Sequence, residues 1–329
     1  MEYMPEFSVA RPASLAELMD VRRAHPDARL LAGGTDLIAN IRRGIVAPEH
    51  LIELTQVAEL QGITVTETGS LRIGAGVTLA ALIEDARIQS DFPVIAAAAR
   101  EVAAASHRQV ATLGGNLCLD TRCVYYNQSE WWRMANDYCL KNRGEICHVA
   151  PKGNHCFAAF SGDVAPALMV LGATVEIVGA DGRRRSCPLP DIYADDGQAH
   201  LRLGAGDCLV AAEVSAPVAD LRTGYAKARV RGAIDFPLAG VAVALRRDGD
   251  TLADLRVALT GTNSCPLLIE DAGDLIDAPL DEVALDRLVD LLPKQIQPMT
   301  STFTPPGYRR KVIANLTRSL ARRLFEEAV

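Results

Sequence analysis

Residues 30–38 read LLAGGTDLI, an apolar strand that runs directly into two glycines, a hydroxyl and a carboxylate. We expect a strand over residues 29–32 that ends in the loop 33–36. Glycine tolerates positive φ, so successive backbone N–H groups of such a loop can converge on an anion, and a threonine hydroxyl adds a donor. Alone, a glycine pair after a strand is more often a plain connection, and the G-x-G-x-x-G pattern of dinucleotide-binding folds is absent here.

A second glycine pair lies in residues 111–117, ATLGGNL. Two such loops are more informative than one, because both can present N–H groups to the same phosphate-bearing ligand. Further along, residues 162–173, GDVAPALMVLGA, predict a helix with Pro166 in its first turn. The acidic residue ahead of it, Asp163, is on these residues alone explained equally well as a helix cap and as a functional carboxylate.

The rest of the chain alternates short apolar strands with alanine- and leucine-rich helices. Ser14 and Glu17 form a capping-box pattern that starts the first helix. The other expected elements up to residue 214 are helices over 15–25, 78–87 and 92–104 and strands over 50–54, 63–66, 71–74, 175–178, 183–187 and 209–214. Strands over 225–230, 238–245 and 252–259, followed by helices over 283–292 and 308–327, indicate a separate carboxy-terminal α+β unit with a three-stranded antiparallel sheet.

Composition limits the function classes. The chain has 329 residues, 49% of them hydrophobic, and a net charge of −7 with no basic block, so we expect no nucleic-acid partner. The amino terminus, MEYMPEFSVARP, lacks the pattern of a signal peptide, and no apolar run is long enough to span a membrane. We therefore predict a cytoplasmic protein without a membrane partner, in which the eight cysteines are core residues, metal ligands or redox groups and not disulfides.

One segment does not follow the alternation. Residues 121–160 read TRCVYYNQSEWWRMANDYCLKNRGEICHVAPKGNHCFAAF and contain four of the eight cysteines and both tryptophans. Aliphatic periodicity nearly vanishes here, so the segment must be held by something other than an apolar face, and thiolates on a metal centre are the obvious candidate. We expect it to be an insert that forms a separate lobe.

The spacing of the four cysteines, C-x15-C-x7-C-x8-C, leaves several kinds of site open. It is not the compact ferredoxin pattern, and by spacing alone a structural zinc site and an iron–sulfur cluster are about equally favoured. A zinc site could also use His148 or His155. Inert core cysteines and reactive thiols are the remaining alternatives.

Taken together, these motifs resemble the FAD-binding medium subunits of the xanthine dehydrogenase and carbon monoxide dehydrogenase family. The matching segments are LLAGGTDLI, LRIGAGVTL, ATLGGNL, GDVAPALMVLGA and YAKAR, which cover essentially the whole chain. The resemblance implies an FAD-binding domain of two α+β subdomains, of the vanillyl-alcohol oxidase and p-cresol methylhydroxylase type, and a carboxy-terminal domain like that of the CO dehydrogenase flavoprotein. We predict the boundaries as residues 1–57 and 58–217 for the two subdomains, with the insert in the second, and 218–329 for the last domain.

The resemblance also implies which residues contact a noncovalent FAD. Two loops would line its pyrophosphate and nearby parts: Leu31, Ala32, Gly33, Gly34, Thr35 and Asp36 in the first, and Thr112, Gly114, Gly115 and Asn116 in the second. Further matching positions are Asp163, Leu209 and Lys227, with Thr78 and His107 as weaker matches. Without the resemblance, Lys227 would be taken as a strand residue whose amine reaches solvent.

The insert is similar to that of a reductase branch of the family, through DTRCVYYNQSEWW and YCLK. The likeness implies that Cys123, Cys139, Cys147 and Cys156 ligate one 4Fe-4S cluster. It also implies partners: a large molybdenum-cofactor subunit, a small subunit with two 2Fe-2S centres, a heterohexamer of two heterotrimers, and ferredoxin as electron donor. Electrons would pass from ferredoxin to the cluster, FAD, the 2Fe-2S centres and molybdenum, so this chain would hold no catalytic residue of its own. The rival hypotheses are the medium subunit of another molybdenum hydroxylase, with a zinc or docking insert, and a flavin-free scaffold or sensor.

Overall fold

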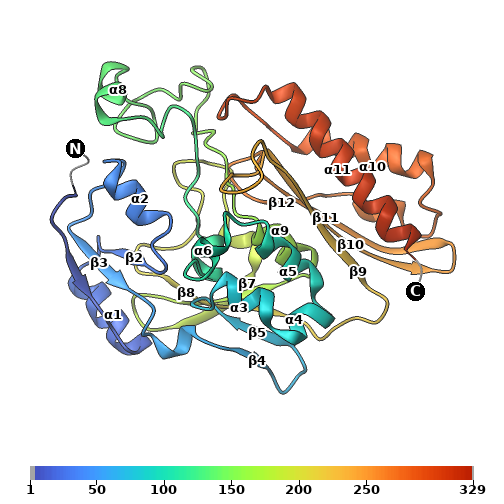
Figure 1. Ribbon diagram of the computed structural model, residues 1–329, viewed down its shortest axis with the longest axis horizontal. Helices are drawn as coiled ribbons and strands as arrows, with labels where there is room; N and C mark the ends of the chain where they lie inside the picture. The colour runs from blue at the N-terminus through green and yellow to red at the C-terminus, as the bar shows by residue number, and fades with distance from the viewer. Residues whose placement is uncertain (1–3, 328–329) are drawn as a thin grey trace.

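The computed structural model describes residues 4–327 and contains three sheets (Figure 1). The first is a parallel sheet of order β1-β3-β2, the second a five-stranded antiparallel sheet of order β4-β5-β8-β6-β7, and the third an antiparallel sheet of order β12-β11-β10-β9. The first two sheets are built from β1 (Ser8–Ala10), β2 (Arg29–Leu31), β3 (His50–Glu53), β4 (Ile63–Val65), β5 (Leu71–Gly74), β6 (Thr174–Val178), β7 (Arg184–Pro188) and β8 (Cys208–Val214).

Short helices surround these sheets. They are α1 (Leu15–Ala24), α2 (Leu37–Arg42), α3 (Leu79–Glu84), α4 (Ala86–Asp91), α5 (Pro93–Arg100), α6 (Ala105–Arg108), α7 (Leu113–Leu117), α8 (Glu130–Ala135) and α9 (Val164–Val170). Every residue of α9 is buried, which explains why its sequence is apolar on all sides. Helix α9 is the centre of the molecule, because it packs on α5 and α7 and on strands β10 and β11 of the third sheet.

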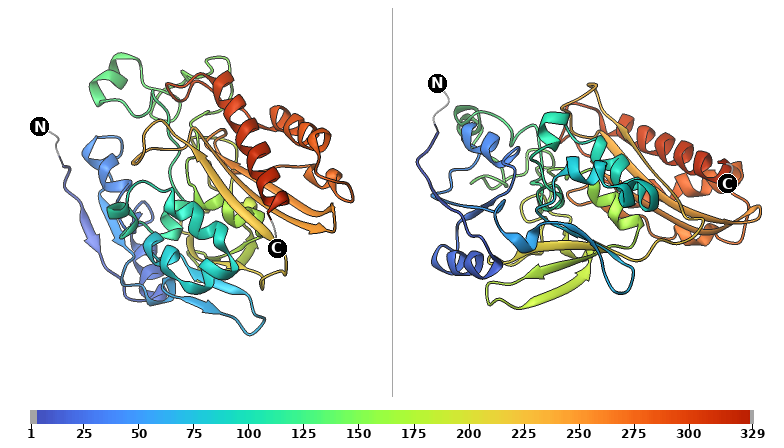
Figure 2. Two further views of the ribbon diagram at one scale, coloured as in Figure 1. Left: turned by 45° about the vertical axis from the view of Figure 1, so that its right-hand side comes forward. Right: turned by 60° about the horizontal axis from the view of Figure 1, so that its bottom comes forward.

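The carboxy-terminal domain places two long helices on one face of its sheet (Figure 2). Its elements are β9 (Arg222–Ala228), β10 (Ala239–Asp248), β11 (Thr251–Thr260), β12 (Leu267–Leu268), α10 (Glu282–Gln295) and α11 (Pro306–Glu326). Strand β10 is apolar on both faces: Val241 and Val243 pack in the core under the helices, whereas the smaller Ala242 and Ala244 belong to the core around α9. The sheet is therefore covered on both sides.

The predicted α+β class and its elements are confirmed, with small differences. The three expected carboxy-terminal strands are β9, β10 and β11, and the two-residue β12 adds a fourth at the edge. The single helix expected over residues 78–87 is wrong. It is two helices, because Asp85 leaves the helical conformation and its carboxylate accepts hydrogen bonds from the N–H groups of Arg87 and Ile88 at the start of α4. None of the helices in the described chain combines the length and apolar character needed to cross a membrane.

The expectation that the insert is a separate lobe is wrong. In Figure 1 its helix α8 lies over α2, and buried cations join the insert to the rest of the chain. The guanidinium of Arg133 donates to the carbonyl oxygen of Gly44 at 2.7 Å, and the backbone N–H of Val124 donates to the carbonyl oxygen of Ser301 at 2.9 Å. The insert is thus attached both to the first sheet's domain and to the carboxy-terminal domain.

Candidate functional site

The two glycine loops lie directly against each other. A Cβ atom at Gly33 would stand 1.9 Å from the carbonyl oxygen of Val110, so only glycine allows this approach. Gly34 has a φ of +70°, which also favours glycine. The loop between β2 and α2 therefore touches the start of the second loop, as the shared-ligand hypothesis requires.

The second loop uses its backbone N–H groups within the protein. Gly114 donates to the carbonyl oxygen of Ala75 at 2.8 Å, Leu113 donates to that of Val77 at 2.9 Å, and Gly115 donates to the hydroxyl of Thr112 at 3.1 Å. The expectation of a second set of free N–H donors is therefore wrong. The loop instead lets two stretches of backbone approach each other closely. Gly114 has no side chain, so it fits directly against Ala75.

Asn116 connects this loop to Asp163. Its side-chain oxygen accepts a hydrogen bond of 3.0 Å from the N–H of Val164, the residue after Asp163. Asp163 occupies the cap position of α9 but makes no side-chain cap hydrogen bond. Its two carboxylate oxygens instead accept from the hydroxyl of Tyr225 at 2.7 Å and from the amine of Lys227 at 2.9 Å. The interpretation of Asp163 as a simple helix cap is wrong.

The Asp163–Lys227 pair is buried at the contact between two domains. The side chains are 4% and 1% exposed, and Lys227 also donates to the carbonyl oxygen of Glu101 at 2.9 Å. A lysine on a strand would usually extend its amine into solvent, but the amine of Lys227 is buried. Burial raises the pKa of Asp163 to about 6, although the charge of Lys227 and the hydrogen bonds from Tyr225 and Lys227 act in the opposite direction.

Tyr225 begins the matching segment YAKAR but was not predicted as a site residue, and Gly240 makes room for it. Tyr225 and Lys227 are two apart on β9, so both side chains lie on the same face of the sheet. On the neighbouring strand, a Cβ atom at Gly240 would stand 2.2 Å from the hydroxyl oxygen of Tyr225. The absence of a side chain there lets the hydroxyl reach Asp163.

The variant Gly240→Ala is expected to destabilise the protein by about 1–3 kcal/mol, the usual cost of overpacking a buried site. The added methyl group pushes the Tyr225 hydroxyl away from Asp163, and thermal unfolding measures the loss. The control is the same change in a Tyr225→Phe background. An equal loss in both backgrounds would show that the hydroxyl is not what the methyl group displaces.

Three of the predicted residues have other roles in this structure. The hydroxyl of Thr78 caps α3 by accepting from Ala81 at 3.2 Å, although its backbone pairs with Thr112 beside the second loop. His107 lies on α6, with its ring 3.5 Å from the hydroxyl of its neighbour Ser106. Leu209 is buried in the main hydrophobic core on β8.

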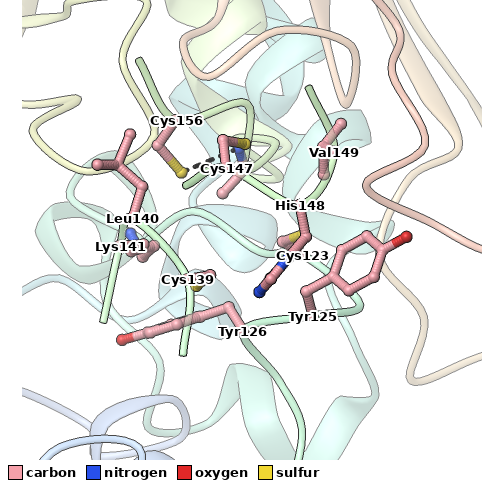
Figure 3. Close-up of a pocket in the computed structure, with 11 residues that line it drawn as sticks. Cys123, Tyr125, Tyr126, Cys139, Leu140, Lys141, Cys147, His148, Val149 and Cys156 are labelled. Carbon is pink, nitrogen blue, oxygen red and sulfur yellow. Dashed lines mark hydrogen bonds between the residues drawn. The ribbon is translucent and has the colours of Figure 1, made fainter. Parts of the chain in front are cut away.

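The four cysteines of the insert line one cavity (Figure 3). All four are buried and none forms a disulfide. Tyr125, Tyr126, Leu140, Lys141, His148, Val149 and Ala158 complete its lining. The structure thus brings together side chains from positions up to 35 residues apart in a segment with little regular secondary structure.

Backbone N–H groups surround the cysteine sulfurs. Burial raises the pKa of Cys123 to about 11, while N–H groups of Tyr125 and Tyr126 act to lower it. A hydrogen bond from Cys156 lowers the pKa of Cys147 to about 5, and the same contact together with burial raises that of Cys156. The donors at the other sulfurs are the N–H groups of Lys141 and Asn142 at Cys139, of Phe157, Ala150 and Val149 at Cys147, and of Ala158 at Cys156. Such donors stabilise thiolates, the form in which cysteine binds metal.

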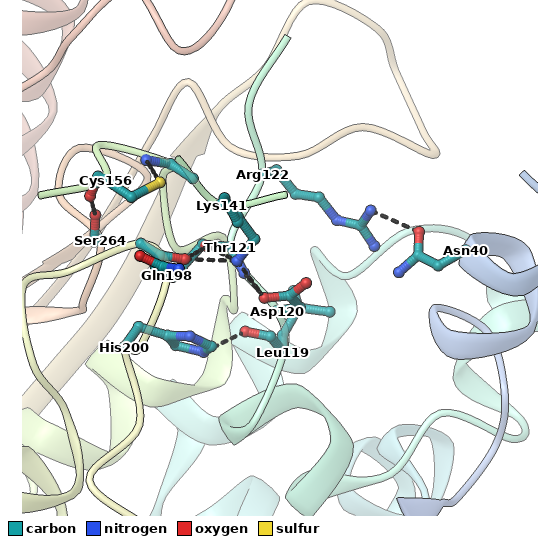
Figure 4. Close-up of polar contacts among 12 residues, drawn as sticks. Asn40, Leu119, Asp120, Thr121, Arg122, Lys141, Cys156, Gln198, His200 and Ser264 are labelled. Carbon is teal, nitrogen blue, oxygen red and sulfur yellow. Dashed lines mark hydrogen bonds and ion pairs between the residues drawn. The ribbon is translucent and has the colours of Figure 1, made fainter. Parts of the chain in front are cut away.

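Lys141 fixes one side of this cavity (Figure 4). Its amine contacts the carboxylate of Asp120 and the hydroxyl of Thr121, both at 2.7 Å, and the carbonyl oxygen of Gly197 at 2.5 Å. Its charge acts to lower the pKa of Cys139 and of Cys156. Among the described residues 4–327, no three His, Cys, Asp or Glu side chains are grouped closely enough to hold a single metal ion.

This fold and these loops define a class of flavoprotein. The model of the "FAD binding domain in molybdopterin dehydrogenase" matches residues 5–214, and that of the "CO dehydrogenase flavoprotein C-terminal domain" matches residues 224–324. The chain belongs to this family: it is an FAD-binding medium subunit of the xanthine dehydrogenase and CO dehydrogenase type of molybdenum hydroxylase.

Individual relatives cover nearly the whole chain. The aldehyde oxidoreductase FAD-binding subunit PaoB of Escherichia coli (strain K12) is 33% identical over 289 residues, 85% of this chain and 88% of the relative. The carbon monoxide dehydrogenase medium chain of Afipia carboxidovorans is 29% identical over 321 residues, 96% of each chain. Among solved structures, reconstituted CO dehydrogenase from Oligotropha carboxidovorans matches with a TM-score of 0.81 and 26% identity, over 99% of this chain and 100% of that one.

Proposed function

We propose that this chain is the electron-transfer subunit of a molybdenum enzyme of the 4-hydroxybenzoyl-CoA reductase type, and that it holds FAD and a 4Fe-4S cluster. Reductive removal of the phenolic hydroxyl, giving benzoyl-CoA and water, consumes two electrons and two protons. Ferredoxin is the proposed electron donor. When bound, the flavin supplies exchange between one-electron and two-electron transfer, and the cluster supplies one-electron transfer at low potential.

A continuous row of contacts supports the FAD site. The first loop touches the second at Gly33, the second reaches α9 through Asn116, and α9 meets β9 through Asp163. These contacts join the positions that the family resemblance assigns to FAD, from three separate parts of the chain. The residues proposed to hold it are Leu31, Ala32, Gly33, Gly34, Thr35, Asp36, Thr112, Gly114, Gly115, Asn116, Asp163 and Lys227, with Thr78, His107 and Leu209 as outlying positions.

The convergence of four thiols on one cavity is the observation that carries the cluster proposal. The proposed ligands are Cys123, Cys139, Cys147 and Cys156. Each sulfur is approached by at least one backbone N–H group, a feature that also tunes the potential of iron–sulfur centres.

The partners follow from the same proposal. A large molybdenum-cofactor subunit would carry the substrate site, and a small subunit with two 2Fe-2S centres would connect it to this chain. We propose a heterohexamer of two such heterotrimers in the cytoplasm, with domain boundaries in this chain near residues 57 and 217.

Metal and flavin analysis of the anaerobically purified complex tests the proposal. We expect about eight iron atoms and eight acid-labile sulfides per heterotrimer, four of each from this chain, with one FAD. Reduction with dithionite should give EPR signals of a 4Fe-4S centre in addition to those of 2Fe-2S centres. Zinc together with only about four irons would contradict the cluster, and the absence of dehydroxylation of 4-hydroxybenzoyl-CoA would contradict the substrate.

An alternative is the FAD subunit of another molybdenum hydroxylase, in which the insert holds zinc or docks a partner. The exposure of Trp131, Met134 and Ile146 on the insert, at 69%, 59% and 52%, favours a docking role. Hydroxylation of an aromatic or aldehyde substrate by the complex, with zinc in place of the additional iron, would select this alternative.

A further inference from the structure

Arg122 lies between the first glycine loop and the cysteine insert. It directly precedes Cys123 in the sequence, and its guanidinium forms an ion pair with the carboxylate of Asp36, the last residue of the glycine loop. The side chain of Arg122 is buried, so water does not compete strongly for this contact. A residue of the insert therefore holds a residue of the proposed FAD site.

The side chains of Asp36, Asn40 and Arg122 contact one another pairwise. The amide nitrogen of Asn40 donates to the carboxylate of Asp36 at 3.0 Å. The amide oxygen of Asn40 accepts from Arg122 at 2.8 Å, as Figure 4 shows. Asp36 makes no side-chain cap hydrogen bond at the start of α2, although it occupies that position. Its carboxylate is thus oriented by Asn40 and Arg122, and the conformation of the loop depends on both.

The other contacts of Arg122 fix it to the insert and to the carboxy-terminal domain. Its backbone N–H donates to the carbonyl oxygen of Ala159 at 2.8 Å, and the N–H of Ala159 donates back at 2.8 Å, so the first and last parts of the insert are joined. The guanidinium also lies 5.6 Å from the centre of the Phe236 ring. Movement of the insert would therefore move the group that holds Asp36.

We propose that Arg122 is a positioning residue that couples the order of the cysteine insert to the affinity for FAD. The inference rests on the proposed FAD and metal sites and adds a link between them. Filling the cysteine site orders Cys123, and with it Arg122 and Asp36. Because coupling between two binding sites is reciprocal, FAD binding must strengthen metal retention by the same factor.

A thermodynamic cycle in the intact complex tests the link. The dissociation constant for FAD is measured by flavin fluorescence in the metal-loaded complex and in the complex stripped of metal by a chelator. For the unaltered protein we expect FAD to bind about tenfold more weakly after stripping, within the usual range of coupling. In Arg122→Gln we expect weak binding in both states and a ratio near one. Arg122→Lys keeps the charge but cannot hold Asp36 and Asn40 together. Its ratio of the two FAD dissociation constants should lie between one and ten.

The matched control is Arg143→Gln. Arg143 is an exposed arginine of the insert that pairs with Glu130 and stacks on Tyr138, and none of its contacts reaches the glycine loop. The link is overturned if Arg122→Gln keeps the tenfold ratio, if Arg143→Gln abolishes it, or if stripping leaves FAD affinity unchanged in the unaltered protein. If Arg122→Gln does not fold, the ratio is measured for Arg122→Lys instead, and an undiminished tenfold ratio overturns the link. The cycle needs only a removable metal, so a zinc insert would contradict the proposed cluster without affecting this test.

Discussion

The Cys139→Ser complex is expected to lose about four of its eight irons per heterotrimer and the EPR signal of the 4Fe-4S centre. Serine replaces a thiolate with a hydroxyl that stays protonated and binds iron weakly. The N–H groups of Lys141 and Asn142 and the charge of Lys141 then face a neutral oxygen in place of sulfur. Iron and sulfide analysis together with EPR measures the effect. With FAD present well above its dissociation constant, the flavin should stay largely bound.

The control for this variant is Cys187→Ser. Cys187 is a half-buried thiol on β7, outside the cysteine cavity, so its loss should leave the iron content unchanged. Retention of all eight irons by Cys139→Ser would rule out Cys139 as a ligand. Loss of iron from both variants would mean that the centre responds to general destabilisation and not to a missing ligand.

Asp163→Ala is expected to lower the free energy of unfolding by about 3–5 kcal/mol and to empty most of the flavin site. The change leaves the amine of Lys227 buried without a counter-charge, which is the costly way to break a buried ion pair. It also removes the acceptor of the Tyr225 hydroxyl, in a contact that joins two domains. Thermal unfolding and the ratio of flavin to protein measure the two effects.

A double variant separates stability from flavin binding. Asp163→Asn with Lys227→Met removes both charges together, so much of the stability should return, because no buried charge is left unpaired. Flavin occupancy should stay low if these two residues contact the cofactor. Full recovery of the flavin would limit the pair to a structural role.

Local patterns in the sequence were sufficient for most of the fold. Ser14 accepts from the N–H of Glu17, as the capping pattern predicts. The carboxylate of Glu17 accepts from the N–H of Ala13, one residue before the cap residue that the pattern specifies. The apolar runs at residues 238–245 and 252–259 predicted β10 and β11, because β10 is buried from Ala239 to Leu245 and β11 from Val257 to Thr260. These features depend on neighbours within a few positions, which the sequence displays directly.

The candidate site was only partly predictable, because its decisive contacts join distant segments. Tyr225 reaches Asp163 across 62 positions, and Arg122 reaches Asn40 across 82. Nothing near Arg122 in the sequence indicates that its partner belongs to a glycine loop. The use of the N–H groups of Leu113 and Gly114 by Val77 and Ala75 likewise depends on the path of the chain. The convergence of four cysteines was inferred from the resemblance and not from their spacing.

The paired hydrogen bonds between Arg122 and Ala159 have a consequence for evolution and engineering. They hold the two ends of residues 123–158 side by side, so the segment leaves and re-enters the fold at nearly one point. A segment with adjacent ends can be gained, lost or transplanted without rearranging the strands around it, since closing a longer loop costs little extra entropy. If the segment is grafted into a relative that lacks it, the relative must also be given the partners of Arg122, which are Asp36 and Asn40.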